Sequence, residues 1–234
     1  MLPIGRYLPP DEKGLARSMA FYPLAGLVIG GLSALSFYLF SLLFPRPLVL
    51  WLTIGFLVLI TGGLHLDGFA DTMDGLASRG TREKVLEVMR DSRVGAFGVI
   101  GLILLIGAKY LALEQIVTPV VPYALSLMTV TGRNSMVLVC YRSPYARPEG
   151  GLAKPFAENL RPREMVISLI SAVCITLLLM GVKGMVVFLG TGLFSLGYRF
   201  FFIKKLGGVT GDILGAANEL SELLCLILLV ILKE

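Results

Sequence analysis

The stretch Gly62-Gly63-Leu64-His65-Leu66-Asp67-Gly68-Phe69-Ala70-Asp71-Thr72-Met73-Asp74-Gly75 directly follows a long apolar segment. If this stretch is helical, Asp67, Asp71 and Asp74 stand at i, i+4 and i+7 and share one face. Three neighbouring carboxylates repel one another, so the arrangement makes physical sense mainly when a hard cation lies among them. The pattern therefore predicts Mg²⁺ chemistry at the edge of a membrane.

The composition is that of a membrane protein. Hydrophobic residues make up 56% of the chain and charged residues 16%, and the mean hydropathy is +0.81, values outside the range of soluble domains. We therefore expect an all-α, polytopic membrane helical bundle that forms a single domain over residues 1–234. A spanning helix needs about 20 mostly apolar residues. Seven segments are candidate transmembrane helices: 18–44, 47–63, 94–114, 119–140, 165–181, 184–203 and 212–232.

The distribution of Lys and Arg gives the orientation, because loops that face the cytoplasm accumulate these residues. With the N-terminus inside, most basic residues fall on the inner side: Arg6, Lys13, Arg17, Arg79, Arg82, Lys84, Arg90, Arg93, Arg142, Arg147, Lys154, Arg161, Arg163, Lys204 and Lys205. The outer side has only Arg46, Lys183 and Lys233. We expect a multi-pass protein of the cytoplasmic (inner) membrane whose active site faces the cytoplasm. The same bias explains the net charge of +5, so this charge does not indicate nucleic-acid binding. The expected partner is the lipid bilayer, and no nucleic acid is expected.

The polar stretch 64–93 is expected to form two short amphipathic helices on the cytoplasmic side. Gly80 suits the end of the first helix, and Thr81 suits the N-cap of the second. The face opposite the aspartates carries an apolar strip that would pack on the bundle, formed by Phe69, Met73 and Leu76. In the second helix Glu83, Glu87 and Asp91 share a face, which is either a solvated surface or, for Asp91, part of the site.

A second candidate site lies where Gly207-Gly208-Val209-Thr210-Gly211-Asp212 leads into the last apolar segment. Glycines ahead of a helix let a phosphate approach exposed backbone N–H groups, and Thr210 is a candidate N-cap. Asp212 would repel a bare phosphate, which again indicates a bridging cation; the alternative is that it complements the helix dipole. Glu219 and Glu222 lie about two to three turns into the span, where a carboxylate is costly and function is the default interpretation.

Cationic side chains complete the candidate set. Arg133 lies within the fourth predicted span, Arg199 near the inner end of the sixth, and Arg147 in the loop between the fourth and fifth. Guanidinium groups bind phosphate oxygens bidentately and stay charged near lipid. Lys109, near the outer end of its span, is most simply a snorkelling residue. His65, the only histidine, either contacts metal or phosphate or has a capping role.

Acidic groups that hold Mg²⁺, glycine turns and arginines at one cytoplasmic cleft suit the transfer of a phosphorylated group from a nucleotide diphosphate ester. The sequence also resembles a known family in these residues. The shared motifs are Gly-Gly-x-His65-x-Asp67-Gly-x-x-Asp71-x-x-Asp74-Gly, then Arg82-Glu83-Lys84-x-Leu86-Glu87-x-Met89-x-Asp91-Ser92-Arg93-x-Gly95, then Arg133, Pro144-Tyr145-Ala146-Arg147, and Gly208-x-Thr210-Gly211-Asp212-x-x-Gly215-Ala216-x-x-Glu219. They are similar to cobalamin synthase, the adenosylcobinamide-GDP ribazoletransferase family, in the expected order from about residue 5 to 225.

The resemblance implies that the 5′-hydroxyl of α-ribazole, or of its 5′-phosphate ester, attacks the phosphorus nearer cobinamide in adenosylcobinamide-GDP. GMP leaves, and adenosylcobalamin or its phosphate forms. On this interpretation the cofactor Mg²⁺ is held by Asp67, Asp71, Asp74, Asp212 and Glu219. The catalytic residues are Asp67, Asp71 and Asp74, together with Asp91 as candidate general base. Substrate contacts are assigned to His65, Arg93, Arg133, Arg147, Arg199, Thr210 and Gly211. The sequence leaves the oligomeric state open, a homo-oligomer included.

Two alternatives belong to other functional classes. Asp71-Thr72-Met73-Asp74-Gly75-Leu76-Ala77-Ser78-Arg79 is similar to the opening motif of CDP-alcohol phosphotransferases, which indicates a phospholipid synthase. The downstream acids Glu83, Glu87 and Asp91 do not keep that family's spacing. A cation-coupled transporter is the second alternative, but transporters place their acids near the bilayer midplane, whereas these cluster at one edge.

Overall fold

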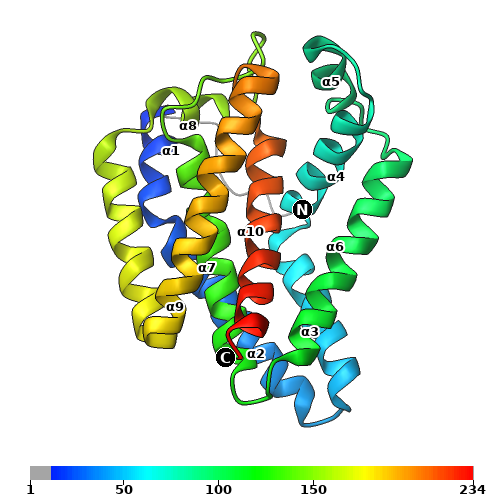
Figure 1. Cartoon of the computed structure of the whole chain (residues 1–234), viewed down its shortest axis with the longest axis vertical. Coiled ribbons are helices and arrows are strands. Elements are labelled where there is room, and N and C mark those ends of the chain that lie inside the picture. Colours follow the sequence, from blue (N-terminus) through cyan, green and yellow to red (C-terminus); the bar gives the residue numbers. More distant parts are fainter. Residues whose placement is uncertain (1–11, 234) are drawn as a thin grey trace, which may run out of the picture.

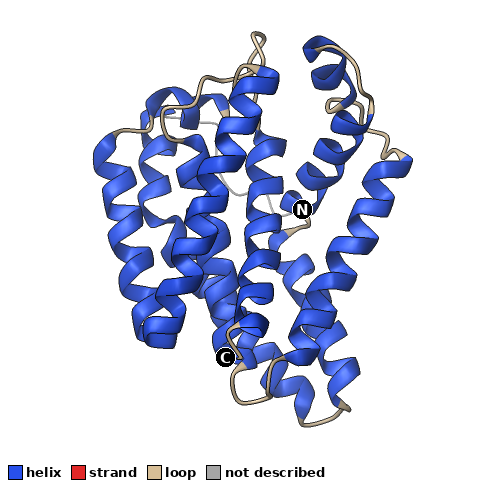
Figure 2. Cartoon of the chain, in the orientation of Figure 1, coloured by secondary structure: helices blue, strands red, loops and turns tan. Residues whose placement is uncertain are grey.

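The structure, a computed structural model, describes residues 12–233. It consists of helices joined by loops, which confirms the predicted all-α class (Figures 1 and 2). Strand pairing within these residues is limited to one parallel bridge, between Tyr145 and Val209. The helices in chain order are α1 (Glu12–Ser18), the short 3-10 helix η1 (Met19–Phe21), α2 (Tyr22–Ser41), α3 (Arg46–Thr61), α4 (Leu64–Ala77), α5 (Arg82–Val88), α6 (Ala96–Gln115), α7 (Val121–Cys140), α8 (Lys154–Asn159), α9 (Pro162–Leu206) and α10 (Gly211–Ile231).

Each segment predicted to span the membrane is helical. By length and composition, four helices among the described residues suit a membrane crossing, and five do so if α3 and α4, which meet at 92°, form one broken span. The count falls below seven partly because the two arms of α9, 45 residues in all, are counted together and because α3 has only 16 residues. The apolar helices are those of a membrane protein, and the number of seven spans stays a prediction.

Helix α9 consists of two arms. Gly181 has φ 55° and ψ −134°, outside the helical region, and Figure 1 shows the chain reversing direction there. A Cβ at Gly184 would lie 2.3 Å from the Thr176 carbonyl oxygen, so the arms need a glycine to pack closely beside the turn. The two segments predicted at 165–181 and 184–203 are therefore the first arm (162–180) and the second arm (182–206) of α9.

Helix α7 lies at the centre of the bundle and packs against α2, α9 and α10. Small residues let α2 approach it: a Cβ at Gly26 would lie 2.5 Å from the Thr129 carbonyl oxygen. The Thr129 hydroxyl donates to the Gly26 carbonyl at 2.7 Å. Close packing of small residues, with a hydroxyl bonded across the interface, is how helices associate in lipid.

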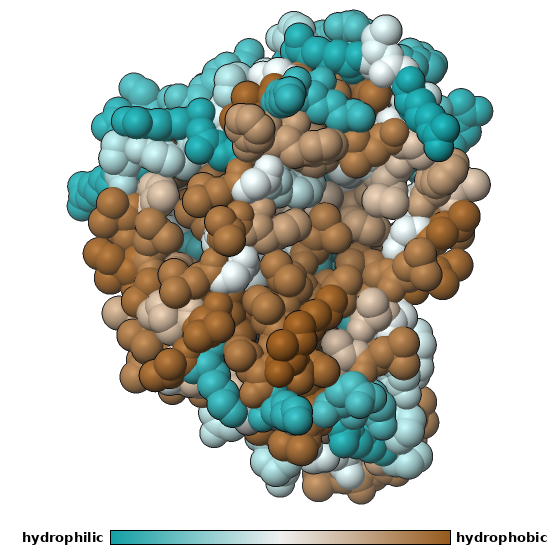
Figure 3. Space-filling model, in the orientation of Figure 1, coloured by the Kyte–Doolittle hydropathy of each residue, from teal (hydrophilic) through white to brown (hydrophobic). Residues whose placement is uncertain are grey.

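The polar segments predicted to share one side of the membrane gather at one end of the molecule. Helices α5 and α8 lie there together with the turn after α9 (Figure 1). Figure 3 shows a broad hydrophobic band between hydrophilic surfaces at the two ends. The hydroxyl of Thr81 accepts from the Lys84 N–H at 3.4 Å, which confirms its N-cap role. The stop predicted at Gly80 is wrong, because the left-handed residue after α4 is Arg79, with φ 49°.

Candidate active site

A cavity of about 350 Å³ opens where α4, α7 and the start of α10 meet the loop after α7. We call it the aspartate cavity, because Asp67 and Asp212 both line it. The other polar residues in its lining include His65, Tyr145 and Arg147. Apolar side chains complete the wall, among them Met19, Tyr22, Met136 and Phe156. The structure thus brings together residues from motifs that are far apart in the sequence.

Two glycines bring α4 and α10 into contact beside this cavity. A Cβ at Gly68 would lie 2.9 Å from Asp212 Cα, and one at Gly215 would lie 3.2 Å from His65 Cα. Any larger residue at Gly68 would force the helices apart. Close backbone approach therefore places the aspartate face of α4 next to Asp212.

The start of α10 holds Asp212 in place. The Thr210 hydroxyl accepts from the Ile213 N–H at 3.3 Å, which confirms the predicted N-cap, and it lies 3.2 Å from Asp212 Oδ2. The same carboxylate oxygen accepts from the Arg147 guanidinium at 2.6 Å. Gly211 also lines the aspartate cavity.

Backbone contacts fix Arg147 in position. The Ala146 N–H donates to the Val209 carbonyl, and the Val209 N–H donates to the Pro144 carbonyl, both at 2.9 Å. Gly208 is required for this approach, because a Cβ there would lie 2.2 Å from the Pro144 oxygen. The Arg82 guanidinium also donates to the Ala146 carbonyl at 2.9 Å. The loop after α7 and the turn before α10 therefore form one unit.

Asp71 and Asp74 lie on the same helix but in different surroundings. The carboxylates that interact electrostatically with Asp71 are those of Asp212, Asp67 and Asp74, against the single cation Arg147. Asp74 instead accepts two backbone hydrogen bonds at the start of α6, from Gly95 N–H at 2.7 Å and Gly98 N–H at 2.8 Å. Asp74 thus stabilises a helix N-terminus, and its predicted role as a metal ligand is untested.

The donor chemistry of the site fits Mg²⁺. Among residues 12–233, no group of three His, Cys, Asp or Glu side chains is arranged to hold a metal ion on its own. Mg²⁺ does not require such a cage, because it is typically bound through one or two carboxylates, waters and substrate phosphates. Asp67, Asp71 and Asp212 supply hard oxygen atoms and an excess of negative charge over Arg147. These three residues would hold the ion.

The structure does not bring Glu219 to this site. Glu219 accepts from the Lys109 ammonium at 2.6 Å, and Glu222 accepts from the same group at 2.7 Å. Lys109 is only 4% exposed, so the prediction that it snorkels is wrong. Arg133, predicted to contact substrate, is also buried; it donates to Glu222 at 3.2 Å and to the Asn218 side-chain oxygen. We call Lys109, Arg133, Asn218, Glu219 and Glu222 the buried ionic cluster.

Other predicted contact residues also have partners within the protein. Asp91 and Arg93 form an exposed ion pair at 2.7 Å. The side chain and the backbone N–H of Arg93 hold the pKa of Asp91 at about 2, which makes this carboxylate a weaker proton acceptor than an ordinary aspartate. Neither residue lines the aspartate cavity. Arg199 donates to the Ser143 hydroxyl at 3.0 Å and to the Arg142 carbonyl at 3.1 Å, and so joins the second arm of α9 to the end of α7.

His65 is a candidate contact residue with a ring nitrogen that has no hydrogen-bond partner among the described residues. It lines the cavity, and its Nδ1 is buried without a hydrogen-bond partner in the described part of the chain. The sequence analysis did not identify two residues of the cavity wall, Tyr22 and Phe156. In the sequence they look like ordinary aromatic residues at the edge of a membrane. Tyr145 belongs to a quoted motif but was given no role. Burial raises its pKa, so the hydroxyl stays protonated, and a Cβ at Gly151 would lie 2.2 Å from it.

Residues 1–230 match the family model described as cobalamin-5-phosphate synthase. The adenosylcobinamide-GDP ribazoletransferase of Geotalea daltonii is 42% identical over 219 residues, which covers 94% of this chain and 88% of that protein. The protein of the same name from Acetivibrio thermocellus is 36% identical over 232 residues, covering 99% of this chain and 94% of the relative. No solved structure matches the chain significantly.

Proposed function

The chain belongs to the cobalamin-5-phosphate synthase family, and we propose that its aspartate cavity is where it carries out nucleotide-loop assembly in cobalamin biosynthesis. The activity is that of an adenosylcobinamide-GDP ribazoletransferase. The observation that carries the location is the convergence of Asp67, Arg147 and Asp212 on one cavity, each from a different motif of the sequence.

In the proposed reaction, a ribose hydroxyl of α-ribazole or of α-ribazole 5′-phosphate attacks the phosphorus nearer cobinamide. The new oxygen–phosphorus bond replaces the bond to GMP, which leaves with the bridging oxygen, while the hydroxyl proton passes to a base. The attacking group cannot be the 5′-hydroxyl if both acceptors react, because the 5′ oxygen of the phosphate ester is already substituted. We therefore propose that another ribose hydroxyl attacks, in place of the 5′-hydroxyl expected from the resemblance.

The residues in and beside the cavity have distinct tasks in this proposal. Asp67, Asp71 and Asp212 hold Mg²⁺, which when bound neutralises pyrophosphate charge and stabilises the leaving nucleotide. Arg147 binds a phosphate oxygen and is oriented by Asp212. The apolar wall around Met19, Met136 and Phe156 receives the benzimidazole ring of the acceptor and excludes water. We place this site on the cytoplasmic side of the cytoplasmic membrane, where the inner loops accumulate Lys and Arg.

The direct test is turnover by the purified protein in detergent or lipid nanodiscs. With adenosylcobinamide-GDP, α-ribazole and Mg²⁺, we expect GMP and a cobamide in equal amounts, and we expect EDTA to abolish both and added Mg²⁺ to restore them. Release of CMP from a CDP-alcohol, without a cobamide product, would instead support the phospholipid synthase. Turnover that persists in EDTA would contradict the assignment of Mg²⁺ but not the proposed activity.

A further inference from the structure

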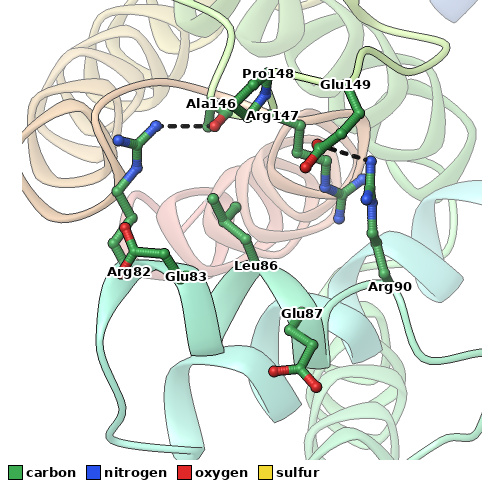
Figure 4. A pocket seen from close by; sticks show the side chains of 9 residues that line it. All are labelled: Arg82, Glu83, Leu86, Glu87, Arg90, Ala146, Arg147, Pro148 and Glu149. Carbon is green, nitrogen blue, oxygen red and sulfur yellow. Dashed lines mark hydrogen bonds and ion pairs between the residues drawn. The ribbon is translucent and has the colours of Figure 1, made fainter.

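A second cavity, of about 360 Å³, lies next to the aspartate cavity, between residues 82–90 and the loop 146–149 (Figure 4). We call it the arginine cavity, because Arg82, Arg90 and Arg147 all line it. Apart from Arg147, the residues that line it have no task in the proposed reaction. Three glutamates, Glu83, Glu87 and Glu149, line it as well, so its charges balance and it offers a polar ligand both hydrogen-bond donors and acceptors.

Arg147 lines both cavities, so they meet at this side chain. Its side chain is 12% exposed, and one nitrogen donates to Asp212. Its Nε is buried and has no hydrogen-bond partner among the residues that the structure describes. A buried N–H without a partner is unfavourable, and a phosphate oxygen at the junction would satisfy it. A ligand phosphate at this point would be reachable from both cavities.

Arg90 and Glu149 give the arginine cavity a paired donor and acceptor, next to the Arg147 side chain (Figure 4). The Arg90 guanidinium and the Glu149 carboxylate lie 3.1 Å apart, and their side chains are 46% and 64% exposed. An exposed ion pair of this kind contributes little to stability, so both groups are free to exchange partners. Leu86 points from α5 toward the loop, between Arg82 and the Arg90–Glu149 pair, and gives the cavity an apolar surface (Figure 4).

This combination matches a guanine base. Arginine donates to O6 and N7 of guanine, and a carboxylate accepts from its N1–H and amino group. Adenine presents an amino donor where guanine has O6, so it does not complement Arg90 in the same way. We propose that the arginine cavity holds the guanosine half of adenosylcobinamide-GDP, with Arg90 and Glu149 on the base and Arg147 on the phosphate.

The proposal rests on the proposed function, because it assigns one substrate of that reaction to a place. In phosphoryl transfer, the attacking and leaving groups lie on opposite sides of the phosphorus. Two cavities that meet at Arg147 provide this arrangement, with the acceptor in the aspartate cavity and the leaving GMP in the arginine cavity. The competing assignment is that the arginine cavity binds the phosphate of α-ribazole 5′-phosphate.

The experiment measures GMP and IMP binding by isothermal titration calorimetry, together with steady-state kinetics, for wild type, R90Q and E149Q. We expect each substitution to weaken GMP binding and to raise KM for adenosylcobinamide-GDP about tenfold or more, as for loss of a bidentate contact to guanine. KM for α-ribazole and for its 5′-phosphate should change less than about twofold. Because IMP lacks the amino group, E149Q should also reduce the preference for GMP over IMP.

Lys84→Gln is the matched control. Lys84 is exposed on α5 and pairs with Glu87, but it does not line the cavity, so losing its charge should leave the two binding affinities and the three KM values unchanged. Unchanged GMP binding in R90Q and E149Q, or a rise confined to KM of α-ribazole 5′-phosphate, would overturn the guanosine assignment. A wild-type protein that forms no cobamide would instead refute the proposed function, and GMP titration would still show whether the cavity binds the nucleotide.

Discussion

Asp71 is the side chain in which the demands of folding and of function oppose each other. Its carboxylate interacts with three like charges, from Asp67, Asp74 and Asp212, and with one cation, Arg147. Such clustering is unfavourable in the free protein and favourable when a divalent cation is bound. Substitution of this residue should therefore separate stability from activity.

We expect Asp71→Asn to lower kcat/KM about a hundredfold or more, because it removes charge that balances the metal and the pyrophosphate. The unfolding temperature of the metal-free protein should stay the same or rise, since like-charge repulsion is relieved. Turnover measured as a function of Mg²⁺ concentration checks the expected loss of activity. Thermal unfolding in EDTA checks the expected stability of the metal-free protein. A variant with near-normal turnover at limiting Mg²⁺, or one inactive only because it unfolds, would show that Asp71 is not a metal ligand.

Asp74 should respond differently although it lies one turn away on the same helix. Both of its oxygens accept backbone N–H groups at the start of α6. Asparagine would turn an amino group toward one of these donors, and an unsatisfied buried donor costs about 1–3 kcal/mol. We therefore expect Asp74→Asn to lower the unfolding temperature in EDTA, where Asp71→Asn does not. Equal unfolding temperatures for wild type and Asp74→Asn would remove this structural role.

At the scale of elements, the buried ionic cluster joins α6, α7 and α10. Two cations, Lys109 and Arg133, face two carboxylates, Glu219 and Glu222, and all four side chains are at most 8% exposed. A buried pair of this kind adds little net stability compared with apolar residues, but removing one partner leaves an uncompensated charge. The cluster therefore specifies how these helices pack.

We expect Lys109→Met to destabilise the protein by about 3–5 kcal/mol, the usual cost of leaving a buried charge without its partner. The double variant Lys109→Met with Glu219→Gln should recover a large part of this loss, because the remaining Arg133 and Glu222 balance. Unfolding in mixed detergent micelles measures both, as a double-mutant cycle. Additive effects of the two substitutions would mean that Lys109 and Glu219 do not interact.

The elements and their caps follow from local sequence, whereas the partners of polar side chains do not. Apolar length places the helices, and Thr81 and Thr210 mark helix starts because their hydroxyls satisfy free N–H groups. Lys109 was misread because its position near a helix end is compatible with snorkelling, and only the packing of α6 on α10 reveals its glutamates. The same packing pairs Glu219 with Lys109, which the sequence alone does not show. In the sequence Asp74 cannot be distinguished from Asp67 and Asp71 on the same helix face. Only the tertiary structure shows that it accepts hydrogen bonds from the start of α6.

The predicted inner and outer segments differ in their number of Lys and Arg residues, and the resulting orientation of the whole molecule is testable. Single cysteines at Ser78, Ala157 and Lys205, in a background without the native cysteines, should resist an impermeant thiol reagent applied outside intact cells. Cysteine at Lys183, which is exposed next to the α9 reversal, should react. Labelling should extend to the first three sites after permeabilisation. Reaction of any of them in intact cells would contradict the predicted topology.

The order of the helices along the chain has a consequence for biosynthesis, because α10 follows α6 and α7. Lys109 and Arg133 leave the ribosome well before Glu219 and Glu222, so the nascent protein carries two unneutralised cations at the depth of the future cluster until α10 arrives. Charged groups within lipid are costly, and the earlier helices cannot settle into their final packing during that interval. Insertion of α10 both neutralises these charges and delivers Asp212 to α4. A chain interrupted before this helix would therefore lack Asp212 and would leave Lys109 and Arg133 without their carboxylate partners.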